Sequence, residues 1–193
     1  MSTKTDLPIV SFESPDEWEA WLADHHTAPS GLWLKIAKKG SGVQTVSHAE
    51  ALDVALCYGW IDGQRDKFDA DFFLQRFTPR TSRSRWSKIN CGKATKLIEQ
   101  GKMKAAGLRE IERARADGRW DAAYEGQSTA TVPDDLRREL ELNDRARAFF
   151  STLDSRNRYA ILYRLQDTRN SETRTRRLRK FVEMLNAGQK IYP

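Results

Sequence analysis

The amino-acid sequence predicts an α+β fold, in which a small, mostly antiparallel sheet with helices is followed by a helical C-terminal part. Two observations indicate this fold. Before Pro79, segments that alternate apolar and polar residues occur between segments with helical spacing, whereas only helical spacing occurs after Pro79. We expect an α+β domain with a Trp- and Arg-rich segment over residues 1–125, and a helical region over residues 131–193 that packs on it.

The first half is predicted to have the order β-α-β-α-β-β. A helix starts at residues 14–17, S-P-D-E, which supply a hydroxyl cap, a proline at the first helical position and a glutamate that can cap back. Residues 32–38, L-W-L-K-I-A-K, have the alternation of a strand with one buried face. A second capping box at residues 47–50, S-H-A-E, starts a helix that ends at Gly59.

The two remaining strands of the sheet are predicted at residues 60–66 and 72–77, joined through an Asp-rich turn as an antiparallel pair. A helix capped by Ser84 or Ser87 then runs to Gly101, and another ends at Gly118. Residues 117–133 have neither period, which predicts an ordered loop or linker. The C-terminal helices are predicted at residues 134–142, 144–153, 156–166 and 172–187.

Composition indicates a globular protein, since 39% of the residues are hydrophobic and 31% are charged. Cys57 and Cys91 match neither a zinc pattern nor a disulfide framework, so we expect buried thiols in a reducing compartment. Residues 1–18 lack the apolar core of a signal peptide, and no later run approaches the length of a membrane span. These observations predict a cytoplasmic protein.

The net charge of +6 lies entirely in the last part of the chain, because residues 151–193 carry ten Lys or Arg and four Asp or Glu. Residues 72–98 form a second basic zone, with seven Lys or Arg and no acidic residue. Both zones favour an anionic partner, although solvated surface charge is always the simpler explanation.

The sequence offers no recognisable catalytic group. The three histidines, His25, His26 and His48, form no metal-ligand pair at helical spacing with a carboxylate, and a capping or solvent-facing role is expected for each. No Gly-rich phosphate loop, nucleophile elbow or zinc pattern occurs. Hydrolase and metalloenzyme functions therefore lose their usual support, and no metal, cofactor or catalytic residue is assigned.

The segment from residue 59 to residue 90 combines three features that suit an anion. Arginine forks pair with phosphate or carboxylate, the free N–H groups of a helix start add donors, and hydroxyl side chains supply neutral donors. Tryptophan rings can wall the site or stack on a planar ligand. The candidate ligand-binding residues of this segment are Trp60, Asp62, Arg76, Thr78, Arg80, Ser84, Trp86, Ser87 and Asn90.

A structural interpretation of the same segment is equally open, namely a basic hairpin edge followed by an ordinary capped helix. Alternation along the strand places Arg76 on the face of two apolar residues, which would draw it inward. Asp62 shares a face with Trp60, so we expect it in the same neighbourhood. An ion pair of Asp62 with Arg76 or Arg80 is favoured over a catalytic set.

The last helix contributes two further candidate ligand-binding residues, Arg174 and Arg177. At about 100° per residue, Arg174 falls on the apolar stripe of this helix and Arg177 at its edge. A guanidinium on a core face requires a carboxylate, a carbonyl or a ligand, because its unpaired burial costs several kcal/mol. The alternative is that Arg174 lies in a frayed first turn.

Five motifs of the chain, in this order, resemble the bacterial YdeI/OmpD-associated family, also called bacteriocin-protection proteins. They are G-W-I-D-G, F-T-P-R, S-x-W-S-x-x-N, G-x-M-x-x-A-G and E-T-R-x-R-R, and the resemblance covers about residues 30 to 190. It implies a role in tolerance of bacteriocins or cationic antimicrobial peptides, without a reaction, cofactor or catalytic residue. Because a chain at +6 repels cationic peptides, we expect any protective role to be indirect.

Three functions are consistent with these observations. The favoured one is binding of a small anionic or phosphorylated ligand by the segment from Trp60 to Asn90, with Arg174 and Arg177. The second is nucleic-acid binding by the basic C-terminal helices, which is less favoured because residues 1–150 are neutral and no nucleic-acid module is recognised. The third is a non-catalytic interaction protein in envelope stress, for which an exposed apolar patch would be the sign.

Overall fold

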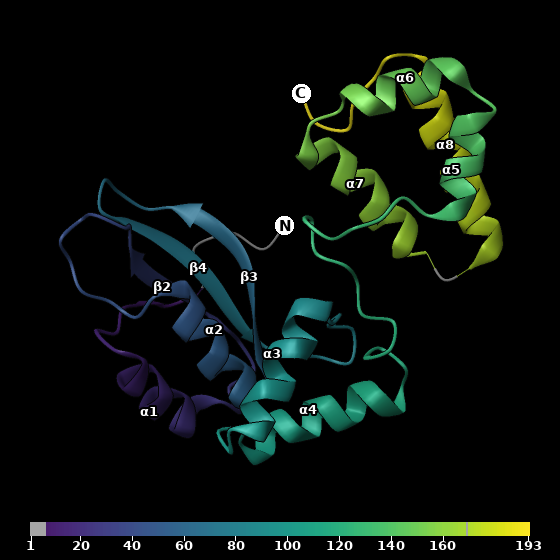
Figure 1. The fold of residues 1–193 in the computed structure, drawn as a ribbon. Helices are drawn as coiled ribbons and strands as arrows, with labels where there is room; N and C mark the ends of the chain where they lie inside the picture. The colour runs from purple at the N-terminus through teal and green to yellow at the C-terminus, as the bar shows by residue number, and fades with distance from the viewer. Residues whose placement is uncertain (1–6, 169) are drawn as a thin grey trace. The chain divides into compact units, whose positions relative to one another are not determined.

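A computed structural model describes residues 7–168 and 170–193, and it divides them into two compact units. The first unit is formed by the chain up to Trp86 and by Asn90–Ala122, and the second by Ser87–Ile89 and Ala123–Pro193. The predicted fold class is confirmed, because a mostly antiparallel sheet with helices precedes a helical C-terminal part (Figure 1). That the C-terminal region packs on the first domain stays a prediction.

A four-stranded sheet with the order β1-β2-β4-β3 forms the centre of the first unit. β1 pairs in parallel with β2, whereas β2 with β4 and β4 with β3 are antiparallel. The predicted hairpin is formed by β3 and β4, and its register shifts between Asp62 and Arg65. The strands are β1 (Ile9–Val10), β2 (Leu32–Ala37), β3 (Trp60–Lys67) and β4 (Phe72–Pro79).

Two capped helices cover one face of this sheet (Figure 1). Ser14 Oγ accepts a hydrogen bond from the amide of Glu17 at 3.3 Å, and Ser47 and Glu50 form the predicted capping box. The ring of Trp18 packs against the ring of Phe77 in β4, with 5.7 Å between centroids. The helices of the first unit are α1 (Pro15–His25), α2 (His48–Cys57), α3 (Lys88–Glu99, whose first two residues belong to the second unit) and α4 (Ala105–Ala116).

The register of the sheet decides which side chains share a face. Leu32 pairs with Phe77, and Trp33 pairs with Arg76. Because side chains alternate along a strand, Leu32 and Phe77 point to the side of α1 and α2, and Trp33 and Arg76 to the opposite side. The arginine of β4 therefore lies on the face away from these helices.

The second unit contains four helices around one apolar core. The sequence predicts that one face of the last helix is buried. Apart from Arg174, the residues of this face belong to the core, namely Leu178, Phe181, Val182 and Leu185. The helices are α5 (Asp134–Glu141), α6 (Asp144–Thr152), α7 (Ser155–Gln166) and α8 (Ser171–Asn186). Each begins and ends within one residue of its prediction, which is inside the usual uncertainty of helix ends.

Candidate anion-binding site

A pocket of about 630 Å³ lies in the first unit, on the sheet face away from α1 and α2. It is lined by residues 29–31, by Gly63 and Gln64 of β3, by the end of β4, and by the following loop. Three predicted site residues, Arg76, Thr78 and Ser84, line this one pocket. The structure therefore brings part of the predicted set together.

Arg76 is the one charged side chain among the described residues that line this pocket. An ideal Cβ on Gly63 would lie 3.8 to 3.9 Å from the Arg76 stem, so the stem crosses the strand next to it at van der Waals distance. Nε of Arg76 is buried without a hydrogen-bond partner, and no carboxylate within the described chain pairs with its guanidinium. The group is thus partly desolvated and its charge is not neutralised nearby, which raises its affinity for an anion.

One wall of the pocket depends on a close approach of Gly31 to β4. An ideal Cβ at Gly31 would lie 2.0 Å from the carbonyl oxygen of Phe77 and 2.5 Å from Cγ2 of Thr78. Neither approach is compatible with a side chain, so glycine is required at this position. The loop of residues 29–31 can therefore lie directly against the strand that carries Arg76.

The loop after β4 is held by hydrogen bonds that use two of its hydroxyl groups. The amide of Thr81 donates to Oγ of Ser84 at 2.9 Å, and the amide of Arg83 donates to Oγ1 of Thr81 at 3.2 Å. Arg119 Nη1 donates to the carbonyl of Ser84 at 2.7 Å, and Asp117 pairs with the same guanidinium at 2.8 Å. Sequence reasoning missed Arg119, which follows a positive-φ glycine at residue 118. Thr78 and Ser30 remain as hydroxyls without a role in this turn.

Arg80 and Trp86 form a buried stacked pair in this loop. The guanidinium carbon of Arg80 lies 3.5 Å from the centroid of the Trp86 ring, and Nη1 donates to the carbonyl of Arg85 at 3.1 Å. Their exposed fractions are 6% and 2%, so both side chains support the loop from inside. A ligand contact of either residue stays a prediction.

Trp60 and Asp62 lie on the opposite face of the sheet from Arg76, because Asp62 pairs in register with Phe77. Trp60 is fully buried, and its indole N–H donates to the carbonyl of His26 at 2.9 Å. The expected ion pair of Asp62 with Arg76 or Arg80 is wrong, since Oδ2 of Asp62 is hydrogen-bonded to Nε2 of His48 at 3.0 Å. The sequence shows alternation within each strand but not which faces coincide.

The remaining predicted residues of the segment are placed at the start of α3. Ser87 directly precedes this helix and Asn90 lies in its first turn, and both are buried. Neither lines the pocket of Arg76. Their contact with a ligand stays a prediction.

The two arginines of α8 have partners within the second unit. Arg174 forms a two-pronged pair with Asp135, from Nε to Oδ2 at 2.6 Å and from Nη2 to Oδ1 at 3.0 Å. Its third nitrogen, Nη1, donates to the carbonyl of Leu165 at 2.6 Å. Arg177 Nη1 donates to the carbonyl of Arg164 at 2.5 Å, so both arginines cap the end of α7.

Two outcomes were expected for Arg174, a partner for its guanidinium or a place in a frayed first turn. The structure shows the first, with a carboxylate and a carbonyl as partners. The Arg174 guanidinium also lowers the pKa of Asp135 below its ordinary value. That Arg174 and Arg177 share a ligand with Arg76 stays a prediction.

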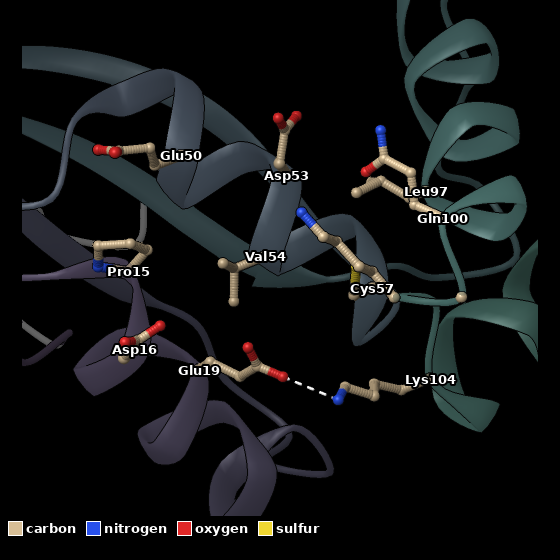
Figure 2. A pocket seen from close by; sticks show the side chains of 12 residues that line it. Pro15, Asp16, Glu19, Glu50, Asp53, Val54, Cys57, Leu97, Gln100 and Lys104 are labelled. Carbon is tan, nitrogen blue, oxygen red and sulfur yellow. Dashed lines mark ion pairs between the residues drawn. The ribbon is translucent and has the colours of Figure 1, made fainter.

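A second pocket of the first unit, of about 470 Å³, is lined by four acidic residues of α1 and α2 and by two lysines, Lys102 and Lys104, among others (Figure 2). Glu19 is paired with Lys104 at 2.9 Å, and Asp53 is paired with Lys93 at 2.5 Å. Burial raises the pKa of the Cys57 thiol to about 11, so that this thiol stays protonated at neutral pH. The pocket has neither an activated nucleophile nor the charge to hold an anion.

The acidic pocket was not predicted from the sequence, although its signal was present. Helix starts favour acidic residues, and both α1 and α2 begin with them, at Asp16 and Glu50. Glu50 already accepts from the amide of Ser47 at 2.9 Å as part of the capping box. The acids of this pocket are thus largely engaged in helix caps and ion pairs.

Thiols and metal ligands give no further site. Cys57 is buried as predicted, whereas Cys91 is half-buried, and both are free. Within residues 7–168 and 170–193, no group of three or more His, Cys, Asp and Glu side chains could hold a metal ion. None of the helices in that part of the chain is long and apolar enough to cross a membrane.

Two family descriptions match the chain. Residues 10–110 match a family described as "Domain of unknown function (DUF8412)", and this match spans β2 to β4, α1 to α3, and the lining residues of the Arg76 pocket other than Leu7. Residues 129–188 match the family described as "Bacteriocin-protection, YdeI or OmpD-Associated", which confirms the predicted resemblance for α5 to α8. No curated protein and no solved structure matches the chain.

Proposed function

Since this chain belongs to the DUF8412 family and carries a YdeI/OmpD-associated region, we propose that its first unit binds a small phosphorylated or otherwise anionic ligand at Arg76. The observation that carries the proposal is the Arg76 guanidinium, which lines a pocket without a carboxylate partner among the described residues. Phosphate and carboxylate groups match the planar fork of arginine, and they accept two parallel hydrogen bonds from it.

The surroundings of Arg76 support a ligand larger than a bare ion. The pocket volume of about 630 Å³ lies within the range of small-molecule sites, which is about 300–1,000 Å³. The hydroxyls of Thr78 and Ser30 line the same pocket and can donate to an anion. The acidic pocket between α1 and α2 does not compete for such a ligand, because its carboxylates repel it.

The test is a titration of the purified full chain with sodium phosphate and with a panel of sugar phosphates and phosphorylated carboxylic acids. Arg76→Met removes the charge but keeps an unbranched stem next to Gly63. Arg83→Met is the matched control, because Arg83 lies in the following loop, is exposed and does not line the pocket. Binding is measured by calorimetry, with a thermal-shift screen to find the ligand.

We expect Arg76→Met to weaken binding about 10- to 100-fold, the effect of losing hydrogen bonds to a charged partner. Arg83→Met should bind as the unchanged protein does. Equal binding by the Arg76→Met and unchanged proteins, or binding by none of them to any of these anions, would refute the proposal.

We further propose that tolerance of bacteriocins, the role in the family description, follows indirectly from ligand binding in the cytoplasm. The free thiols of Cys57 and Cys91 support a reducing compartment. The net charge of +6 opposes direct capture of cationic peptides. Bacteria that express the unchanged protein should survive a cationic peptide better than bacteria that express Arg76→Met. Equal survival would show that tolerance does not depend on ligand binding at Arg76.

A further inference from the structure

A slot of about 350 Å³ lies within the second unit, apart from the residues of the proposed anion site. Most of its lining residues belong to α7, and Gln127 and Tyr192 complete the lining. Residues 156, 159, 160, 163 and 164 of α7 lie on one face of this helix, because they follow the spacing of three and four that aligns side chains on a helix. The slot is lined by Arg156, Tyr159, Ala160, Tyr163, Arg164 and Tyr192.

The position of Tyr192 is fixed by a buried amide side chain. Asn157, which is 1% exposed, accepts from the amide of Tyr192 through Oδ1 at 2.8 Å and donates to its carbonyl through Nδ2 at 3.2 Å. Asp154 accepts from the same Nδ2 at 3.2 Å, so that the orientation of the amide is fixed. Because the Asn157 side chain is hydrogen-bonded to both backbone groups of Tyr192, it holds this residue in place, with its ring at the slot.

Two guanidinium groups accompany this ring. The guanidinium carbons of Arg156 and Arg164 lie 4.2 Å and 5.7 Å from the Tyr192 ring centroid. Arg164 Nη2 also donates to the hydroxyl of Tyr192 at 3.3 Å, and this interaction lowers the pKa of Tyr192. Within the described part of the chain, neither arginine forms an ion pair with a carboxylate.

The slot thus combines aromatic rings with positive charge and contains no acidic lining residue. Aromatic rings bind any base through its flat face, and arginines bind phosphate through paired N–H groups. The Arg76 pocket offers the charge but no aromatic lining residue. The slot therefore selects for a ligand that is both planar and anionic.

We infer that this slot binds a nucleotide, with the base stacked on the tyrosine rings and the phosphate paired with Arg156 and Arg164. A volume of about 350 Å³ is near the lower limit of small-molecule sites, which suits a single nucleotide. A free mononucleotide and one nucleotide of a single strand present the same chemistry. The inference is independent of the proposed function, because it uses a different unit and different residues.

The test is calorimetric titration of the full chain with AMP, GMP, CMP and UMP, with sodium phosphate, and with single-stranded RNA and DNA. The variants are Tyr192→Ala, Tyr192→Phe and Arg164→Gln. Arg158→Gln is the matched control, since Arg158 lies on the same helix but over the Phe150 ring and outside the slot. Circular dichroism verifies that each variant is folded.

We expect Tyr192→Ala and Arg164→Gln each to weaken nucleotide binding about tenfold or more, as loss of a stacking or phosphate contact does. Tyr192→Phe keeps the ring and should retain most of the affinity, and Arg158→Gln should bind as the unchanged protein does. Binding to a single strand that is tighter than to its mononucleotides assigns the slot to nucleic acid. Equal binding assigns it to free nucleotides.

Three results would overturn the inference. They are no binding of any nucleotide or strand, unchanged affinity in both Tyr192→Ala and Arg164→Gln, and phosphate binding as tight as that of the mononucleotides. The last result would show that the rings contribute nothing. Repeating the titrations in the Arg76→Met background removes the Arg76 site, so failure of this site and failure of the Arg76 site are distinguishable.

Discussion

The pair between Asp135 and Arg174 should contribute measurably to the stability of the second unit, and Asp135→Asn tests this. The substitution removes the charge of the carboxylate but keeps its size. Arg174 would retain the carbonyl of Leu165 and lose its charged two-pronged partner. Asp134→Asn is the matched control, because Asp134 is the preceding residue, is 83% exposed, and pairs only with the exposed Arg137.

The magnitude follows from the exposure of the pair. Breaking a fully buried ion pair costs about 3–5 kcal/mol, whereas an exposed pair contributes about 0–1 kcal/mol. Asp135 and Arg174 are 27% and 28% exposed, which places their pair between these limits. We expect Asp135→Asn to lower the free energy of unfolding by about 1–2 kcal/mol, and Asp134→Asn by less than about 0.5 kcal/mol.

The assay uses urea denaturation of the full chain with two signals. All six tryptophans lie at or before residue 120, so tryptophan fluorescence reports the first unit, whereas circular dichroism includes the helices of the second. Asp135→Asn should lower the midpoint of the dichroism transition. Equal effects of Asp135→Asn and Asp134→Asn at pH 7 would refute the reasoning.

The effect should also depend on pH. The pKa of Asp135 is lowered in the folded chain, chiefly by its hydrogen bonds from Arg174, relative to about 3.9 when unfolded. Its contribution is therefore fully present above the unfolded pKa, and it is lost as pH falls through the lower folded pKa. The stability difference between Asp135→Asn and the unchanged protein should be constant at neutral pH and shrink below about pH 4. A difference that grows in acid would contradict this assignment.

Three further predictions concern the first unit. Gly31→Ala should destabilise it by about 1–3 kcal/mol in thermal unfolding followed by tryptophan fluorescence, because its Cβ would overlap backbone atoms, whereas Gly92→Ala, with open space around it, should not. Iodoacetamide should alkylate Cys57 and Cys91 about 100-fold more slowly in the folded than in the urea-unfolded chain at pH 8, since their pKa values are raised to about 11; equal rates would count against burial. Arg119→Met should increase proteolytic cleavage in the loop after β4, and an unchanged digestion pattern would show that the hydrogen bond to Ser84 is dispensable.

The helices could be predicted from the sequence because their signals are local. The capping residues Ser14 and Ser47 and the apolar stripe of α8 specify starts and faces within a few neighbouring residues. The same stripe showed that Arg174 needs a partner. Its partner, Asp135, lies 39 residues away, and no local pattern indicates which carboxylate approaches.

The candidate site was harder to predict because it depends on the pairing of distant strands. Alternation alone placed Asp62 near Arg76, but the register of β3 with β4 puts the two on opposite faces of the sheet. A tryptophan such as Trp60 suits the wall of a ligand site and a hydrophobic core equally well. The structure places Trp60 in the core. Of the predicted set, Arg76, Thr78 and Ser84 line one pocket because the loop and β4 are adjacent in the chain.

The carbonyl groups that end α7 find their donors on another helix, and this limits how the chain can be shortened. A version that stops before Ser171 would remove Arg174 and Arg177, and the carbonyls of Arg164 and Leu165 would lose those two charged donors. The last turn of α7 would then unwind. Any minimal fragment designed for study by nuclear magnetic resonance must keep α7 and α8 together.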